Sequence, residues 1–433
     1  MQYYSTNNTT LKADLKEAIF KGLPADNGLF MPEEIPVLPS DFMQQLPGLS
    51  FQEISYRVAQ NLIGDDIPAN DLQGIIERAI NFPAPVVGIN ERIGTLELFH
   101  GPSLAFKDFG GRFMAETMSY LNRGADQPLT ILVATSGDTG GAVAAGFYKT
   151  PGIQVVILYP SGKVSPLQEK QLTTLGENIT ALEVTGTFDD CQALVKKAFL
   201  DDEINRRRRL SSANSINIAR LIPQSFYYFE SYKQVMQQHD KVVYVVPSGN
   251  FGNLTAGLLA KKMGLPVHHF IAATNNNNVV PEYLSTGEYH PRPSVRTLSN
   301  AMDVGAPSNF ARMLDLYCST WNMMKSEISG YAFDDVQTEN AVRRVWNQYE
   351  YMLDPHGAVG YLAAEAWEKE HPDTYNIVLE TAHPAKFLED MERIIGDKIP
   401  VPQRLAALAD REKHAIPMST SFADFKNWLM DNA

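Results

Sequence analysis

The chain has only two cysteines, Cys191 and Cys318, among its 433 residues. Two thiols cannot form the disulfide framework of a small secreted domain or a four-thiolate metal site. Free thiols suit a reducing compartment, and the first residues lack the charged start and apolar stretch of a signal peptide. No apolar run approaches the ~20 residues of a membrane-spanning helix. We therefore expect a cytoplasmic protein that has neither a membrane partner nor a metal site.

Positive charge is also scarce. Lysine and arginine total 37 against 50 aspartates and glutamates, which gives a net charge of −13. Such a chain repels nucleic acid and anionic lipid, so neither is expected as a partner. The one basic run, Arg206–Arg209, follows an acidic run at 201–203 after two intervening residues and is interpreted as a solvated helix end.

Sequence repeats, low-complexity tracts, the GxGxxG fingerprint and the P-loop pattern are all missing. Dinucleotide and triphosphate binding therefore lose their usual support. The composition is otherwise that of a globular protein, with 44% hydrophobic and 20% charged residues. The length predicts two or three domains.

Short apolar runs separated by helix-length stretches dominate the chain after about residue 90. They lie at 129–134, 154–159, 179–184, 242–246, 269–273 and 377–379. Near-continuous apolar runs of this kind are typical of strands buried on both faces of a parallel sheet. The fold class is therefore predicted as α/β, with functional loops at the carboxyl ends of the strands.

Three regions are expected along the chain. Residues 1–90 are predicted to form a mainly helical segment, and residues 91–240 and 241–433 to form two α/β domains. Within the last domain, residues 275–335 are rich in Asn, Ser and Pro and predict an irregular insertion. Residues 218–237 predict one long helix, whose aromatic stripe (226, 227 and 229) is expected to pack in the core.

The segment His100–Arg112 holds a lysine in unusual surroundings. Lys107 stands next to Phe106 and two residues before Phe109, and partial desolvation of an amine lowers its pKa and makes it nucleophilic. A Schiff base with an aldehyde cofactor needs such an amine. A surface lysine paired with Asp108 explains the same residues equally well, and the segment alone leaves both interpretations open.

Two further segments place glycines and polar residues between a strand and a helix. In residues 134–142, hydroxyls and backbone N–H groups at a helix start can bind phosphate or carboxylate. The alternative is a simple N-cap made by Asp138 or Thr139. In residues 247–255, Gly249 and Gly252 allow close approach of the main chain to a phosphate, although a plain strand–helix turn remains an alternative.

Residues 211–220 form a fourth such segment. It contains Asn214 and Ser215, followed by Arg220 within two helical turns. Amide, hydroxyl and guanidinium groups together suit a second anion. Helix capping beside an ordinary surface arginine is the alternative. Taken together, the four segments offer one amine and several anion sites on strand–helix junctions.

With these four segments and several others, the chain resembles a known family from end to end. The chain is similar to the threonine synthases of the longer bacterial and fungal type, which are fold-type-II enzymes dependent on pyridoxal 5'-phosphate (PLP). The matching stretches are Gly28–Pro32, Glu97–Pro102, Lys107–Gly110, Thr135–Gly140, Ser248–Asn253 and Thr381–Phe387. The resemblance implies two parallel-sheet domains around a bound PLP.

The resemblance also implies a role for individual residues. Lys107 is the expected Schiff-base lysine, and Thr381 the hydroxyl that faces the pyridine nitrogen. The expected loop around the cofactor phosphate contains Gly249, Asn250, Phe251 and Asn253. The expected substrate-binding set is Ser136, Thr139, Asn214, Ser215 and Arg220.

The implied reaction converts O-phospho-L-homoserine and water into L-threonine and phosphate. A related phospho-lyase that releases 2-oxobutanoate, and a binding protein that has lost catalysis on the same scaffold, remain alternatives. The second alternative is disfavoured because Lys107 and the loop 249–253 are intact. The sequence leaves the oligomeric state open and is compatible with a monomer.

Overall fold

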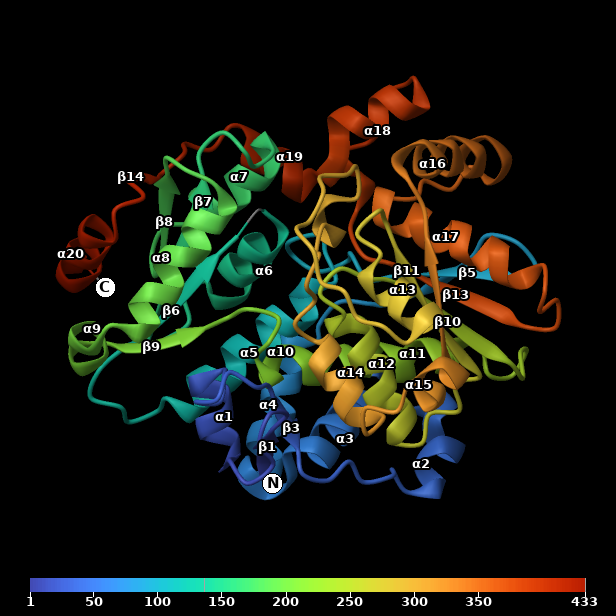
Figure 1. The fold of residues 1–433 in the computed structure, drawn as a ribbon, viewed down its shortest axis with the longest axis horizontal. Helices are drawn as coiled ribbons and strands as arrows, with labels where there is room; N and C mark the ends of the chain where they lie inside the picture. Colours follow the sequence, from blue (N-terminus) through green and yellow to red (C-terminus); the bar gives the residue numbers. More distant parts are fainter. Residues whose placement is uncertain (136, 433) are drawn as a thin grey trace.

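A five-stranded parallel sheet forms one half of the molecule in the computed structural model, which describes residues 1–135 and 137–432. The strand order is β14-β8-β7-β6-β9. Its strands are β6 (Leu129–Ala134), β7 (Ile153–Pro160), β8 (Ile179–Val184), β9 (Arg209–Ser212) and β14 (Ile416–Met418). The neighbouring helices are α5 (Lys107–Leu121), α6 (Asp138–Phe147), α7 (Pro166–Thr173), α8 (Phe188–Leu200) and α9 (Asp202–Arg207). Three of the predicted strands, β6 to β8, are confirmed (Figure 1).

A six-stranded sheet forms the other half, in the order β12-β11-β10-β13-β5-β4. Its strands are β4 (Val86–Gly88), β5 (Ile93–Glu97), β10 (Val242–Pro247), β11 (His269–Thr274), β12 (Ile328–Ala332) and β13 (Tyr375–Glu380). All neighbours pair in parallel except β4 with β5. Its helices include α12 (Gly252–Lys262), α13 (Val279–Thr286), α16 (Asp335–Tyr349) and α17 (Pro355–Glu368). The predicted α/β class with two mainly parallel sheets is confirmed.

The two sheets do not follow the chain order simply. Strands β4 and β5 come early in the sequence but join the sheet formed mainly by residues after 241. The last segment, with α18 (Leu388–Ile395), α19 (Gln403–Ala409), β14 and α20 (Phe422–Asn432), runs back to the five-stranded sheet, as Figure 1 shows in red. Segments from both ends of the chain thus join sheets formed mainly by other regions. The expected domain ranges remain a prediction.

The predicted helix over 218–237 is interrupted. It consists of α10 (Ile218–Leu221), a 3-10 turn (Ile222–Ser225) and α11 (Phe226–Val235). Pro223 lies in the turn and cannot donate a backbone hydrogen bond, which explains the break. The aromatic stripe is fully buried, as expected for core packing. The region 275–335, expected to be irregular, also contains α13, α14 (Phe310–Leu316), α15 (Trp321–Glu327) and the edge strand β12.

The N-terminal segment combines helices with a small antiparallel sheet. The sheet contains β1 (Tyr3–Ser5), β2 (Lys12–Ala13) and β3 (Phe30–Pro32), and the helices are α1 (Leu15–Lys21), α2 (Ser40–Gln45), α3 (Phe51–Ile63) and α4 (Ala69–Ala79). Its apolar side chains belong to the same core cluster as α5 and α11. Among the described residues, no helix is both long enough and apolar enough to span a bilayer.

Candidate active site

Three loops meet at the carboxyl edge of the six-stranded sheet because β5, β10 and β13 are parallel neighbours. The segment after β5 leads to Lys107, the turn after β10 is the glycine-rich loop, and Thr381 follows β13 directly. The backbone N–H of Phe106 donates to the carbonyl of Thr381 at 2.9 Å. The predicted cofactor lysine and the predicted pyridine-facing hydroxyl are thus held in adjacent segments.

The carboxyl edge of the five-stranded sheet supplies the other side of the site. Thr139 lies in the first turn of α6, Asn214 and Ser215 lie in the loop after β9, and Arg220 lies in α10. The amide of Asn250 donates to the Ser215 hydroxyl at 2.6 Å, and Asn309 donates to the Asn250 carbonyl at 3.1 Å. These contacts join the two predicted anion loops across the boundary between the sheets.

Lys107 opens helix α5, and only 16% of its side chain is exposed. Its ammonium nitrogen lies 5.3 Å from the centre of the Phe106 ring. Burial lowers the pKa of Lys107, and the nearby positive charges of Lys386 and Arg220 lower it further. An amine with these properties is suited to Schiff-base formation.

The alternative pairing of Lys107 with Asp108 does not occur. The carboxylate of Asp108 accepts the backbone N–H of Ser103 at 2.9 Å, and burial raises its pKa to about 6. The acid nearest to Lys107 is instead Asp138, whose Oδ2 lies 3.8 Å from the lysine nitrogen.

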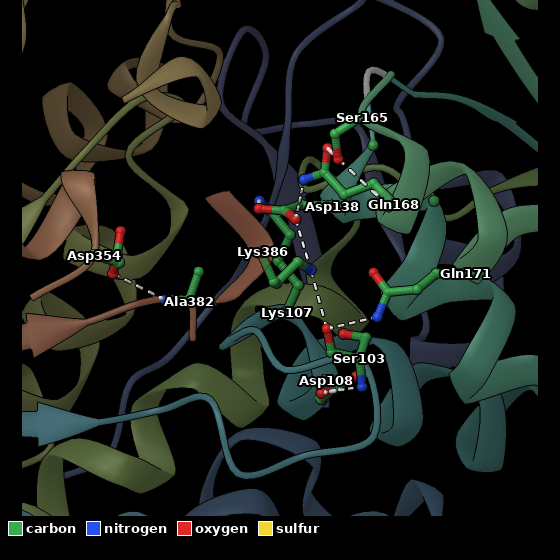
Figure 2. Close-up of polar contacts among 12 residues, drawn as sticks. Ser103, Lys107, Asp108, Asp138, Ser165, Gln168, Gln171, Asp354, Ala382 and Lys386 are labelled. Atoms are coloured by element: carbon green, nitrogen blue, oxygen red, sulfur yellow. Dashed lines mark hydrogen bonds and ion pairs between the residues drawn. The ribbon is translucent and has the colours of Figure 1, made fainter. Parts of the chain in front are cut away.

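Asp138 is the centre of a buried polar network (Figure 2). Its Oδ1 is 2.7 Å from the ammonium nitrogen of Lys386 and accepts the Gln168 amide at 2.8 Å. Lys386 also donates to the carbonyl of Ser103 at 3.0 Å. Although burial raises the pKa of Asp138, the charges of Lys386 and Lys107 lower it more, so the carboxylate stays ionised.

The loop from Gly249 to Asn253 has the shape of an anion cradle. Phe251 adopts a left-handed backbone conformation (φ 60°) directly before helix α12. A Cβ added at Gly252 would lie 3.5 Å from the nearest described atom, so the main chain there is open to approach, whereas one at Gly249 would lie 2.8 Å from backbone atoms of residues 301 and 302. The Asn253 amide holds the turn by donating to the Pro247 carbonyl at 2.8 Å.

A second polar cluster lies beside Thr381. Asp354, the N-cap of α17, contacts the ring of His356 at 2.6 Å and accepts the Ala382 N–H at 3.3 Å. Glu380 accepts the backbone N–H of Asp354, and burial next to Asp354 raises the pKa of Glu380 well above its usual range. The Nε2 atom of His356 is buried and has no hydrogen-bond partner among the described residues.

Arg220 is 2% exposed and lies against Gly110 of α5, one turn after Lys107. Its Nη1 donates to the Ala213 carbonyl at 2.6 Å, while its buried Nε has no partner among the described residues. Burial lowers the pKa of Arg220 to about 10. This is not the surface arginine of the alternative interpretation.

The remaining predicted substrate residues are less constrained. Thr139 lies in the first turn of α6, and Asn214 precedes Ser215 in the loop after β9, both half-buried. Ser136 lies outside the described residues. The expected cap by Asp138 or Thr139 is wrong, because the Thr135 hydroxyl accepts the N–H groups of residues 137 and 140 instead.

Several residues of the site were missed from the sequence. They are Ser103, Asp138, Gln168, Asp354, His356, Glu380 and Lys386. Asp138 and Lys386 both lie inside stretches that resemble the family, Thr135–Gly140 and Thr381–Phe387. Their position in these stretches was the only sequence feature that could have marked them as site residues. Their pairing joins residues 248 positions apart and is not visible in any local pattern.

Three family models together match nearly the whole chain. The model described as "Pyridoxal-phosphate dependent enzyme" matches residues 90–380, "Threonine synthase N terminus" residues 2–80 and "Threonine synthase, C-terminal" residues 357–428. The first of these alone covers well over half of the sequence and includes most of the site described above.

Individual proteins agree with the family models. The threonine synthase of Escherichia coli K12 is 44% identical over 100% of both chains, and that of Saccharomyces cerevisiae is 36% identical over 95% of this chain and 94% of its own. A structure of PLP-bound threonine synthase from Brucella melitensis superposes with a TM-score of 0.94 at 34% identity, covering 100% of this chain and 99% of that one. The chain belongs to the threonine synthase family of PLP-dependent enzymes.

Proposed function

We propose that this protein converts O-phospho-L-homoserine and water into L-threonine and inorganic phosphate, with PLP held by Lys107. The strongest support is the position of Lys107, whose buried amine of lowered pKa lies where the carboxyl edges of two parallel sheets meet. Membership in the threonine synthase family over the full length supports the same reaction.

The residues present fit the cofactor. The Lys107 amine would bind its aldehyde, and the loop of Gly249, Asn250, Phe251 and Asn253 would bind its phosphate through backbone N–H groups and the dipole of α12. Asn253 would contribute through its main chain, because its side chain holds the turn. Thr381 is buried directly after β13, and its hydroxyl would face the pyridine nitrogen.

PLP, when bound, withdraws electrons from the substrate carbon that carries the amino group. The Lys107 amine is the group placed to remove the Cα proton and then a Cβ proton. At the end it can return a proton to Cα. Loss of the Cβ proton expels phosphate from Cγ. A proton then adds at Cγ, which becomes the methyl carbon of threonine, and water adds at Cβ.

The substrate phosphate is the second anion that the site has to hold. We propose that Arg220 binds it together with Ser136, Thr139, Asn214 and Ser215. The guanidinium is planar and can bind two oxygens at once, and its Nε lacks a partner among the described residues. Held there, the departing phosphate stays near the reacting carbons.

Product analysis separates this function from its alternatives. Full-length protein with PLP is incubated with O-phospho-L-homoserine, and phosphate, threonine and 2-oxobutanoate are measured together. We expect threonine and phosphate in equal amounts. Release of 2-oxobutanoate with phosphate would mean a phospho-lyase, and binding without any product would mean a non-catalytic protein.

We also propose that the enzyme acts in the cytoplasm, because Cys191 and Cys318 are both free thiols, as a reducing compartment maintains them. The sequence is compatible with a monomer, and sedimentation of the purified protein would test this oligomeric state.

A further inference from the structure

A second lysine, Lys386, is buried in the site beside Lys107 (Figure 2). It belongs to a 3-10 turn after β13, and its side chain is fully buried. Two of its three N–H donors are used, by Asp138 at 2.7 Å and by the Ser103 carbonyl at 3.0 Å. A buried ammonium persists only where such partners compensate the loss of water.

The carboxylate of Asp138 therefore lies between two ammonium groups. The tight contact is with Lys386, and the 3.8 Å separation from Lys107 exceeds hydrogen-bond distance. The Gln168 amide fixes the same oxygen that Lys386 contacts, and Gln168 in turn contacts the Ser165 hydroxyl at 3.0 Å. The carboxylate is thus oriented so that Lys386, and not Lys107, is its main counter-ion.

We propose that Lys386 is a positioning residue that neutralises Asp138 and thereby keeps the Lys107 amine free to bond the cofactor and to transfer protons. This inference rests on the role given to Lys107 under the proposed function. Lys386 itself forms no bond to the reacting atoms.

The charges around Lys107 support this role. Asp138 on α6 and Asp354 before α17 favour its ammonium form, while Lys386 on the 3-10 turn and Arg220 on α10 disfavour it. Burial is the largest influence, and together with the two cations it outweighs the two acids, so the pKa of Lys107 is lowered. Without Lys386, negative charge would dominate around the amine.

Two further titratable groups lie nearby. Asp108, on the same helix as Lys107, faces the Ser103 backbone, and its charge is offset by Lys386 and Arg112. His356 on α17 acts on Asp138. Neither residue is substituted in the variants below. Any effect of losing Lys386 on Asp108 is common to Lys386→Met and the double variant, so the difference between those two reports the Asp138 charge.

The test follows imine formation and needs no turnover. Full-length protein freed of cofactor is mixed with PLP at a series of pH values, and the rate of borohydride-reducible labelling of Lys107 gives the apparent pKa of its amine. In Lys386→Met we expect this pKa to rise by about one unit or more, which lowers the rate at neutral pH about tenfold or more. Lys386→Met/Asp138→Asn should return the profile to within about half a unit of the wild type, since both charges of the pair are gone.

Lys163→Met, which removes an exposed lysine, is the matched control and should behave like the wild type. If Lys386→Met fails to fold, Asp138→Asn is compared with the double variant, because neither contains a buried carboxylate without its partner. The charge of Lys386 should then make the apparent pKa of Lys107 lower in Asp138→Asn than in the double variant.

Equal pH profiles in wild type and Lys386→Met would overturn the proposal, as would a double variant that keeps the shift of Lys386→Met. Where Asp138→Asn is compared with the double variant, equal apparent pKa values would overturn it. A label on a lysine other than Lys107 would instead refute the proposed function, so the two failures are distinguishable.

Discussion

Replacing Arg220 by methionine removes the guanidinium while keeping much of its volume against Gly110. Arg220 is 2% exposed, so an alanine would also leave a cavity, which methionine partly fills. A hydrogen bond to a charged group contributes about 1.5–3 kcal/mol. Loss of the phosphate contact should therefore lower kcat/KM for O-phospho-L-homoserine by roughly 10- to 150-fold.

The assay compares kcat/KM with the inhibition constant of inorganic phosphate, while the PLP absorbance reports cofactor binding. We expect both substrate and phosphate to bind more weakly with an unchanged cofactor spectrum. Lysine at this position should restore activity only in part, because it offers a point charge without the planar fork. Arg209→Met is the matched control. Arg209 also donates to a backbone carbonyl, but it lies at the start of β9, whereas Arg220 lies beyond the other end of this strand.

Arg220 also donates to the Ala213 carbonyl, next to Asn214 and Ser215, so a displaced loop could mimic a lost phosphate contact. Phosphate inhibition distinguishes the two causes. Full kcat/KM in Arg220→Met would refute the phosphate role, and loss of PLP with normal substrate affinity would assign the arginine to the cofactor.

Four further substitutions test the phosphate loop, Asp108 and Arg312. Gly252→Val should weaken PLP binding strongly without a large loss of stability, because the added Cβ meets no described atom closer than 3.5 Å. Normal PLP occupancy in this variant would refute the phosphate-binding role of the loop. Gly249→Val should instead destabilise the fold, because its Cβ would lie 2.8 Å from backbone atoms. In the folded protein the pKa of Asp108 is raised to about 6, so the fold favours the protonated carboxyl. The contribution of Asp108 to the free energy of unfolding therefore falls as the pH rises toward 7. The free energy of unfolding should fall by roughly 1 kcal/mol more in the wild type than in Asp108→Asn between pH 5 and 7, and parallel urea curves would contradict this. Arg312→Met should lower Tm by several degrees, because this fully buried side chain donates to carbonyls of residues 30 and 216; an unchanged Tm would show that these bonds do not stabilise the N-terminal segment.

Strands and their junctions with helices were predictable because their signals are local. Six buried strands (β6, β7, β8, β10, β11 and β13) show as apolar runs, and glycines or hydroxyls mark turns that follow such strands, as at Gly249. Parallel strands bring such turns to one edge, which is why Lys107, the loop and Thr381 meet. Strands β4, β5, β9, β12 and β14 were missed because they are short or contain glycine, proline or polar residues.

The polar network around Asp138 was not predictable in the same way. Its partners come from three segments, and their contacts depend on how two sheets are placed relative to each other. The capping prediction failed for a related reason: Asp138 looks like a cap locally, but a buried ammonium competes for its oxygen, and Thr135 takes the capping role. Local patterns identify where chemistry occurs more readily than which charges balance there.

Reduction of the PLP-loaded protein with borohydride, followed by peptide mapping, identifies the lysine that bonds the cofactor. The site holds two lysines near the Asp138 carboxylate: the half-buried Lys107 at 3.8 Å and the fully buried Lys386 at 2.7 Å. We predict that the reduced cofactor is found on Lys107 alone, and that Lys107→Ala leaves PLP without a covalent bond and abolishes turnover. Reduced cofactor on Lys386, or on any other lysine, would contradict the account.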